Sequence, residues 1–220
     1  ESSGKSLIAY NFAYSCQQLG GHVIWVDAEQ SWMNSWAQTN GVDPERVTVV
    51  NDTRIENVAD AVADLALYFR SQLIHNEPIL LVIDSVAAMD CADNIDSKMT
   101  DAKAEMGGRA KALYKYFRIR SELFYRLGVT QIYINQLRTA LNVGFGKDNT
   151  TTTGGAALKF YASIRAAFYS GRSITVKQKG KERKAGKLVT VRLIKNKVAP
   201  PRPTISKCPV YFNPKFHEVG

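Results

Sequence analysis

Short apolar runs alternate with helical periods along the first part of the chain. The runs at 22–27, 47–50 and 79–84 are rich in β-branched side chains and predict buried strands. Between them, apolar residues recur every three or four positions, which predicts helices. These predicted helices follow Lys5, where Ile8, Phe12, Ser15 and Leu19 share one face before Gly20-Gly21, and cover 30–40 and 55–73.

The second half is more varied. Residues 90–108 and 137–153 are polar, contain glycine and lack a period, so they predict long loops, which in a compact domain are usually functional or disordered. Between these loops a helix is predicted over 109–127, with Leu113, Phe117, Phe124 and Leu127 inward, and a strand over 130–135. A short helix over 156–161, strands over 163–170, 173–178 and 188–194, a hairpin tip over 177–187 and irregular chain after 199–203 complete the prediction.

Strands that alternate with helices predict an α/β fold with a mostly parallel central sheet flanked by helices. The later strands have no helices between them, so they predict antiparallel hairpin strands toward the C-terminus. We therefore expect one α/β core over 1–220, and polar side chains at the carboxyl ends of its parallel strands, where ligands bind in open sheets.

Composition narrows the class of protein. The chain has 220 residues, of which 45% are hydrophobic and 22% charged, so it can bury a core and is not a disordered segment. It shows no apolar run of the ~18 residues that a membrane span needs, and no signal peptide. Cys16, Cys91 and Cys208 are an odd, widely spaced set, which favours reduced thiols and a cytoplasmic protein. The net charge of +9 permits nucleic acid as a partner.

The first six residues contain the second half of a phosphate-binding loop. The full pattern is Gly, four residues, then Gly-Lys-Ser/Thr, and Gly4-Lys5-Ser6 opens a predicted helix. Gly4 would let backbone N–H groups turn toward phosphate oxygens, Lys5 would place a cation on the β- and γ-phosphates, and Ser6 could bind Mg²⁺. A surface turn with this sequence by chance is the alternative. Because the chain opens inside a motif and without Met, we expect it to be part of a longer protein.

Two predicted strands end in acidic residues. Asp84 follows the run Ile79 to Ile83, as the Mg²⁺-binding Asp of a Walker B strand follows a buried strand in a phosphate-loop ATPase. Asp27-Ala28-Glu29 follows the strand at 22–27. An apolar strand that ends in Asp is common without any such role, and the pairing with Gly4-Lys5-Ser6 is what favours an ATPase.

Two groups of cations stand out, each with a plain alternative. Lys111, Lys115 and Arg118 share one face of the helix predicted over 109–127, and such spacing usually means a solvated face. The basic tract at 177–187 could touch DNA, but a solvated turn is the favoured explanation.

Taken together, these stretches resemble the RecA family of DNA recombinases, bacterial or phage. The resemblance runs in family order across nearly the whole chain, and the stretch 134–165 is its most specific part. The residues that carry it are Glu1-Ser2-Ser3-Gly4-Lys5-Ser6, Val26-Asp27-Ala28-Glu29, Val-Ile-Asp-Ser-Val-Ala-Ala at 82–88, Ile-Asn-Gln-Leu-Arg at 134–138, Phe145-Gly146, Thr-Thr-Thr-Gly-Gly at 151–155, Ala-Leu-Lys-Phe-Tyr-Ala-Ser-Ile-Arg at 157–165 and Lys195-Asn-Lys-Val-Ala-Pro200.

The resemblance implies a RecA-type ATPase core that binds ATP and Mg²⁺ between the subunits of a helical filament. Residues 1–6 and Asp84 match the phosphate and Mg²⁺ site, and Glu29 matches the glutamate that activates the attacking water. Trp36 falls where an aromatic residue stacks on adenine, although core packing is an equal alternative. Gln136 matches the γ-phosphate sensor, and Lys195 and Lys197 match cations that reach the neighbouring subunit's ATP.

The resemblance also implies contacts with single- and double-stranded DNA and with a second subunit. The DNA contacts would come from two loops, at about 92–107 and 137–155, and from the basic helix face between them. Lys159 and Phe160 fall at a family interface position. The implied DNA-binding residues are Met106, Lys111, Arg118, Arg138, Phe145, Thr152, Thr153, Gly154 and Gly155.

The chain departs from the family pattern in three respects. Four threonines stand in the second loop where three are expected, and Lys111 replaces an Arg, which would turn a bidentate phosphate contact into a point charge. The first Gly of the phosphate loop, an N-terminal oligomerisation element and a C-terminal domain are not in the sequence, so we expect a core truncated at both ends.

These observations predict a DNA-dependent ATPase that pairs and exchanges strands in homologous recombination. A ring-forming helicase or a RadA/Sms-type repair ATPase shares the phosphate loop and the acidic strand end, and is the first alternative. An ATP-gated scaffold on DNA, or an inactive fragment, is the second.

Overall fold

A computed structural model describes residues 4–74, 76–96, 107–139, 150–178, 181–200 and 204–212. Its core is a four-stranded parallel sheet with the order β2-β1-β3-β4. These strands are β1 (His22–Asp27), β2 (Val47–Val50), β3 (Ile79–Asp84) and β4 (Val129–Tyr133). The predicted mostly parallel α/β core is confirmed, with the first three strands at their predicted bounds.

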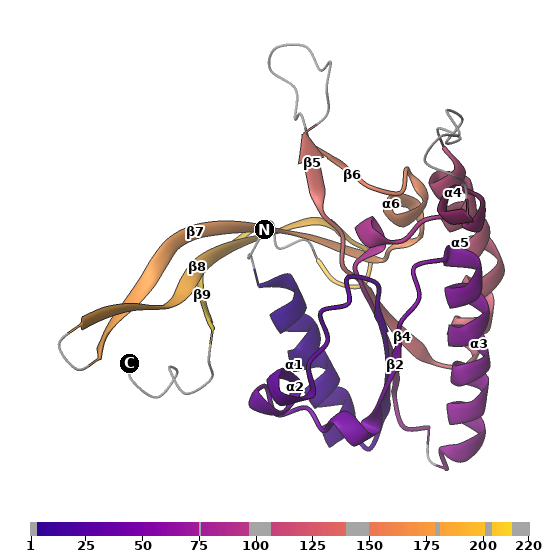
Figure 1. Cartoon of the computed structure of the whole chain (residues 1–220), viewed down its shortest axis with the longest axis horizontal. Helices are drawn as coiled ribbons and strands as arrows, with labels where there is room; N and C mark the ends of the chain where they lie inside the picture. The colour runs from indigo at the N-terminus through magenta and orange to yellow at the C-terminus, as the bar shows by residue number, and fades with distance from the viewer. Residues whose placement is uncertain are drawn as a thin grey trace.

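Helices cover both faces of this sheet (Figure 1). On one side lie α1 (Lys5–Gln18) and α2 (Asn34–Thr39), and on the other α3 (Ile55–Gln72) and α5 (Gly108–Arg126). Successive side chains of each strand point to opposite faces of the sheet. Val23 and Trp25 pack toward α1, whereas Ile24 and Val26 pack toward α3 and α5. The two layers of core follow from the strand period of two.

The face of α1 that the sequence analysis selected is wrong. Phe12 is 51% exposed and Leu19 69% exposed, while Ala9, Ala13 and Cys16 are buried against the sheet. Tyr10 is buried with them, so the face of α1 that contacts the sheet consists of three small side chains and one large ring, while Phe12 and Leu19 stay outside.

Three shorter predictions also need correction. The helix predicted over 30–40 begins only at Asn34. The residues before it form a turn, because the Asp27 carboxylate accepts hydrogen bonds from the backbone N–H groups of Ser31 (3.0 Å) and Trp32 (2.8 Å). Within the loop predicted over 90–108, residues Ala92–Asp96 form α4. The loop predicted over 137–153 is closed at its base by an antiparallel pair, β5 (Leu137–Thr139) and β6 (Thr150–Thr152).

The C-terminal part forms a second, antiparallel sheet of order β7-β8-β9. β7 (Ile164–Gln178) is one strand rather than the two predicted, since a register shift between Ser170 and Ser173 absorbs the break. β8 (Lys181–Asn196) includes most of the predicted hairpin tip, and β9 (Thr204–Tyr211) replaces the irregular chain predicted after 199–203. β9 is an edge strand, the position in a sheet that tolerates Pro209.

The short helix α6 (Ala157–Tyr161) confirms the prediction over 156–161 and connects β6 to β7. The single-turn 3-10 helices Pro44–Arg46 and Val86–Ala88 complete the described elements. Among the described helices, none combines the length and the apolar character needed to cross a membrane.

Candidate functional site

The N-terminus of α1 meets the carboxyl end of β3. Gly4 precedes the helix with φ 80°, a left-handed conformation that glycine adopts without strain. A Cβ at Gly4 would lie 2.8 Å from Val210 of β9, so close packing also requires glycine there. Lys5 and Ser6 are the first helical residues, and their N–H groups lie at the positive end of the helix dipole. Glu1, Ser2 and Ser3 lie outside the described residues.

Ser6 and Asp84 form the polar floor of the site. The Ser6 hydroxyl is hydrogen-bonded to the Asp84 carboxylate, which is buried at the end of β3. Burial raises the pKa of Asp84, Glu29 and Asp27 raise it further, and Ser6 and Lys5 act in the opposite direction. The floor therefore holds more negative charge than Lys5 balances, which suits a divalent cation.

The donor set fits Mg²⁺ in part. A hydroxyl and a carboxylate oxygen are ligands that this hard cation prefers. The described residues include no group of three or more His, Cys, Asp and Glu side chains that could hold a metal alone. Ser6 and Asp84 would therefore anchor the ion, and water or a bound anion would complete its shell.

Glu29 lies beside this floor and is tied to β3 twice. The N–H groups of Ala28 and Glu29 donate to the carbonyl of Asp84, at 3.0 and 3.3 Å. The Glu29 carboxylate accepts a short hydrogen bond from the hydroxyl of Ser85, which is fully buried. The sequence analysis assigned Ser85 no role, although Ser85 lies directly after Asp84 in the stretch 82–88 that carries the RecA resemblance.

The end of β4 supplies the other partner of Glu29. Gln136 Nε2 donates to the same Glu29 oxygen at 3.1 Å. Its neighbour Asn135 donates from Nδ2 to the carbonyl of Thr153 at 2.8 Å, where the second long loop ends. The adjacent residues Asn135 and Gln136 thus connect the Glu29 carboxylate to the base of that loop.

An aromatic cavity of about 270 Å³ opens from this floor. Tyr10 stacks on Trp25 with ring centroids 4.7 Å apart, and Trp32 lies 5.5 Å from Tyr10. Burial raises the pKa of Tyr10 to about 12, with smaller contributions from Asp84 and Asp27. Trp36 both lines the cavity and packs on the core beneath α1. Packing in the core and stacking on a base are therefore compatible roles for this residue. The lining residues are Ser6, Tyr10, Trp25, Ser31, Trp32, Met33, Trp36 and Asp84.

Comparison with known proteins shows to which family the chain belongs. Residues 1–213 match the family described as RecA N-terminal domain. This chain belongs to the RecA family. It is 37% identical over 202 residues to Protein RecA of Sulfurimonas denitrificans, covering 91% of this chain and 54% of that protein. It is 34% identical over 221 residues to Protein RecA of Picosynechococcus sp., covering 100% of this chain and 59% of that protein. The chain thus spans little more than half the length of these relatives.

Two lysines that the RecA resemblance assigns to catalysis lie apart from the Glu29 group. Lys195 Nζ donates to the carbonyls of Lys159 (2.8 Å) and Phe160 (2.9 Å), which lie in the last turn of α6. Lys197 is exposed, and its backbone N–H donates to the carbonyl of Ser163. Within one chain Lys195 therefore caps α6, and neither lysine joins the group around Glu29. Phe160 itself is 71% exposed.

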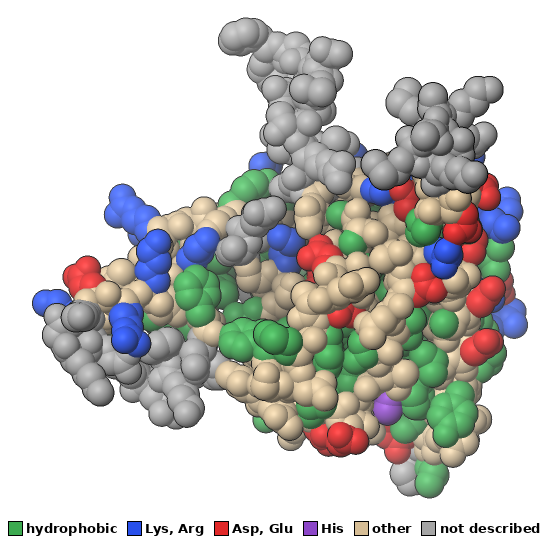
Figure 2. Space-filling model, viewed as in Figure 1, with side chains coloured by type: hydrophobic (Ala, Val, Ile, Leu, Met, Phe, Trp, Pro, Cys, Tyr) green, Lys and Arg blue, Asp and Glu red, His purple; other side chains and the backbone are tan. Residues whose placement is uncertain are grey.

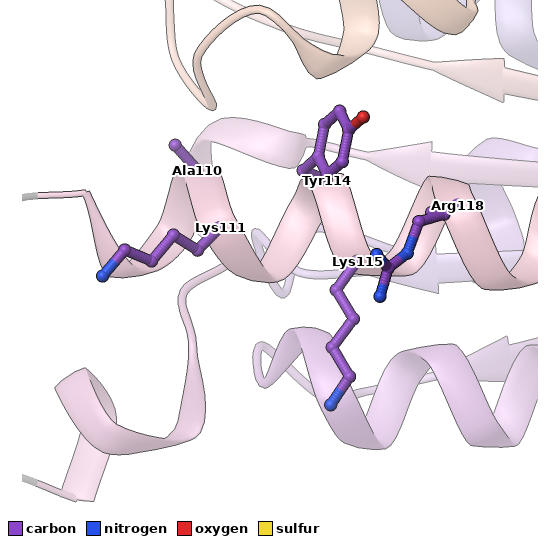
Figure 3. Close-up of a pocket in the computed structure, with 5 residues that line it drawn as sticks. All are labelled: Ala110, Lys111, Tyr114, Lys115 and Arg118. Carbon is purple, nitrogen blue, oxygen red and sulfur yellow. The ribbon is translucent and has the colours of Figure 1, made fainter.

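The DNA-binding residues implied for this RecA chain are described only in part. Figure 3 shows Lys111, Lys115 and Arg118 projecting from successive turns of α5, and with Ala110 and Tyr114 they line a shallow hollow of about 440 Å³. Met106 and Phe145 lie outside the described residues. The backbones of Arg138 and Thr152 lie in the paired strands β5 and β6.

Gly154 and Gly155 end the second loop with φ 90° and 71°. A Cβ at Gly154 would lie 2.5 Å from Cδ1 of Leu113, a buried core residue of α5. Glycine at this position therefore lets the loop end pack directly on α5, and a role in packing accompanies any role in binding.

We expect Gly154→Ala to lower the free energy of unfolding by about 2–4 kcal/mol, since it combines left-handed strain with overpacking against Leu113. The matched control is Gly107→Ala, because Gly107 also has a left-handed φ of 106° but a methyl group there would have no described residue within 4 Å. The control should cost only about 1–2 kcal/mol. Urea unfolding measures both, and equal losses would show that the Leu113 contact is unimportant.

Proposed function

We propose that this chain is the ATPase core of a homologous recombination protein that forms filaments on single-stranded DNA. It would pair and exchange strands and hydrolyse ATP faster when DNA is bound. The observation that carries the proposal is the hydrogen-bonded group of Glu29, Ser85 and Gln136 beside Ser6 and Asp84, in a chain of the RecA family.

Nucleotide binding would use the floor and the aromatic cavity. The backbone N–H groups at Gly4 to Ser6 and the Lys5 ammonium would hold the phosphates, and Trp36 would stack on the base. Bound Mg²⁺ would neutralise charge that develops on the transferring phosphoryl group. Because Asp84 is poorly solvated, a cation next to it would be held more strongly than at an exposed carboxylate.

Hydrolysis would depend on Glu29. Its carboxylate is exposed at the edge of the floor, so it can accept a proton from an attacking water as general base. The Ser85 hydroxyl would orient the carboxylate, because it donates to the same oxygen that Gln136 contacts. Lys195 and Lys197 would act on the ATP of a neighbouring subunit through the α6 surface that includes Lys159 and Phe160.

Coupling to DNA would pass through Gln136 and Asn135. A γ-phosphate would compete with Glu29 for the Gln136 amide, and release of Glu29 would free it for catalysis. Because Asn135 holds the Thr153 carbonyl, a shift of this strand end would reach the loop at 137–155. DNA on that loop and on the α5 cations would favour the same state of Gln136.

The test of this proposal is ATP hydrolysis by the full-length protein, with and without single-stranded DNA, at two salt concentrations. Strong stimulation by DNA that weakens at higher salt is the expected result. A rate of ATP hydrolysis that is the same with and without DNA would refute the recombinase function and favour a related helicase or repair ATPase.

Ser85→Ala should lower kcat for ATP hydrolysis about 2- to 13-fold with KM almost unchanged, because loss of one orienting hydrogen bond of about 0.5–1.5 kcal/mol disturbs the base and leaves the phosphate contacts intact. The control is Ser15→Ala, which removes an exposed hydroxyl bonded to the Asn11 carbonyl. In a Glu29→Gln background, Ser85→Ala should cost nothing further. An equal additional loss there would show that Ser85 acts independently of Glu29.

A further inference from the structure

The chain after β3 leads away from the Glu29 group. It begins at Ser85, whose hydroxyl donates to the Glu29 carboxylate, and reaches Asp90 after a single-turn 3-10 helix. Between these two ends, Val86 and Met89 are buried in the core. A closely packed segment transmits strain instead of absorbing it, so the positions of Ser85 and Asp90 depend on each other.

Asp90 is held by two other elements. Its backbone N–H donates to the carbonyl of Thr53 at 2.9 Å, and its carbonyl accepts from the N–H of Ile55 at 2.9 Å, which ties it to the start of α3. Its carboxylate oxygen Oδ1 accepts from the N–H of Cys91 at 2.8 Å and from Nδ2 of Asn94, in α4, at 2.9 Å. The second oxygen, Oδ2, faces a partner from another helix.

That partner is Arg109, in the first turn of α5. Its Nη2 donates to Asp90 Oδ2 at 2.8 Å, and its Nη1 donates to the carbonyl of Ala87 at 3.4 Å. A Cβ on Gly108, the first residue of α5, would lie 2.9 Å from Sγ of Cys91. The start of α5 is therefore joined to the chain after β3 by two hydrogen bonds and by close packing.

The Arg109–Asp90 ion pair is more buried than its neighbour. Figure 2 shows acidic and basic side chains interspersed over this end of the molecule, at the upper right. There the side chains of Arg54 and Asp96 pair while 38% and 61% exposed, whereas those of Arg109 and Asp90 are only 28% and 24% exposed. Burial alone would raise the pKa of Asp90, but hydrogen bonds from Arg109 and Asn94 hold it below its ordinary value. The carboxylate is thus charged and paired.

Stability alone does not account for Arg109. Its Nε is buried and has no hydrogen-bond partner among the residues that the structure describes. Such a group is unfavourable, and apolar side chains that pack well can replace a half-buried ion pair without loss of stability. What the guanidinium does provide is directional contact with two points of the chain after β3, which defines one position of α5 relative to that strand.

The helix α5 also carries Lys111, Lys115 and Arg118, the cations to which the proposed function assigns DNA. Arg109 precedes Lys111 by two residues in the same helix. Rigid secondary elements carry coupling between distant sites, so a shift of α5 on DNA would move the Arg109 guanidinium and pull on Asp90.

We propose that Arg109 is a positioning residue for DNA-stimulated ATP hydrolysis. Its contacts with the chain after β3 carry the position of α5 to Ser85, and Ser85 orients the Glu29 carboxylate. This connection is separate from the one through Gln136. The inference rests on the proposed function, because it requires that DNA on α5 stimulates hydrolysis at Glu29.

The experiment compares Arg109→Gln with Arg120→Gln in the full-length protein. Arg120 lies on the same helix and pairs with Asp60 of α3, so its variant removes an ion pair of α5 with a different element. ATP hydrolysis is measured with and without saturating single-stranded DNA. In Arg109→Gln the ratio of the two rates should fall by about fivefold or more, within the usual range of coupling between two sites. The rate without DNA and the KM for ATP should be unchanged, and Arg120→Gln should match the wild type.

The ratio of rates separates coupling from stability. A loss of folded protein would lower both rates equally and leave their ratio unchanged. Asp90→Asn keeps the shape of the side chain and should lower the ratio as Arg109→Gln does, and it provides the same test if Arg109→Gln does not fold. The two substitutions together should lower the ratio no further than either alone, because they remove the same contact.

The outcomes distinguish this inference from the proposed function. With a wild type that DNA stimulates, an unchanged ratio in Arg109→Gln or Asp90→Asn would overturn the inference alone. An equal loss in Arg120→Gln, or additive losses in the combined variant, would overturn it as well. Absence of stimulation in the wild type would instead refute the proposed function, and the inference with it.

Discussion

Glu29→Gln is expected to lower kcat for DNA-stimulated ATP hydrolysis by about 10²–10⁴-fold, the usual contribution of a positioned general base. The amide keeps the size of the carboxylate, and its oxygen can still accept the Ser85 hydrogen bond. The local structure should therefore persist, and only the capacity to take a proton is lost. Steady-state hydrolysis measures kcat, and a separate titration measures the affinity for nucleotide.

The matched control for this variant is Glu122→Gln. Glu122 is an exposed carboxylate on α5, paired with Arg126 one turn away, and its side chain is 72% exposed. Such a pair contributes little, so hydrolysis should be unchanged. Nucleotide affinity of Glu29→Gln should stay within a few-fold of wild type. Retention of more than a tenth of the hydrolysis rate would mean that Glu29 is not the base.

Lys5→Ala should weaken nucleotide binding about 10- to 100-fold. Lys5 opens α1 and acts electrostatically on Asp84, so its cation belongs to the phosphate floor. A hydrogen bond to a charged group is worth about 1.5–3 kcal/mol, which corresponds to this range of affinity. The variant also leaves Asp84 without its nearby cation, which further disfavours a carboxylate in a poorly solvated position.

Lys115→Ala provides the control for Lys5→Ala, because it removes the same side chain from the α5 face. It should leave nucleotide affinity unchanged and weaken DNA binding modestly, with a salt slope reduced by about 1. Titration with a fluorescent ATP analogue checks the first point, and DNA binding at two salt concentrations checks the second. An unaltered nucleotide affinity in Lys5→Ala would contradict the phosphate assignment.

The sequence was most informative where a local pattern sufficed. The strands at 22–27, 47–50 and 79–84 are short continuous apolar runs, and the helix that begins at Ile55 has a strong helical period. Both patterns report which residues a regular element buries. Because these strands are parallel, their carboxyl ends had to share one edge. The proximity of Asp84 and Glu29 followed from that alone.

The sequence was least informative where pairing or packing involved distant residues. β9 has no clear alternation, and it became a strand because β8 offered an edge to Cys208 and its neighbours. β5 and β6 have three residues each, too few for a period, and they form because the ends of one loop meet. The buried face of α1 was missed because, apart from Tyr10, its contact uses the small residues Ala9, Ala13 and Cys16, which a count of large apolar residues overlooks.

The sequence by itself determined the order of elements, the phosphate-binding motif at the start of α1 and the family to which the chain belongs. Only the tertiary structure decided that Ser85 and Gln136 share one oxygen of Glu29, that Lys195 caps α6, and that the basic tract near the C-terminus forms a projecting ribbon. The reason is physical. Periods and motifs are set by neighbours along the chain, whereas hydrogen-bond partners and exposed edges are set by which distant segments the fold brings into contact.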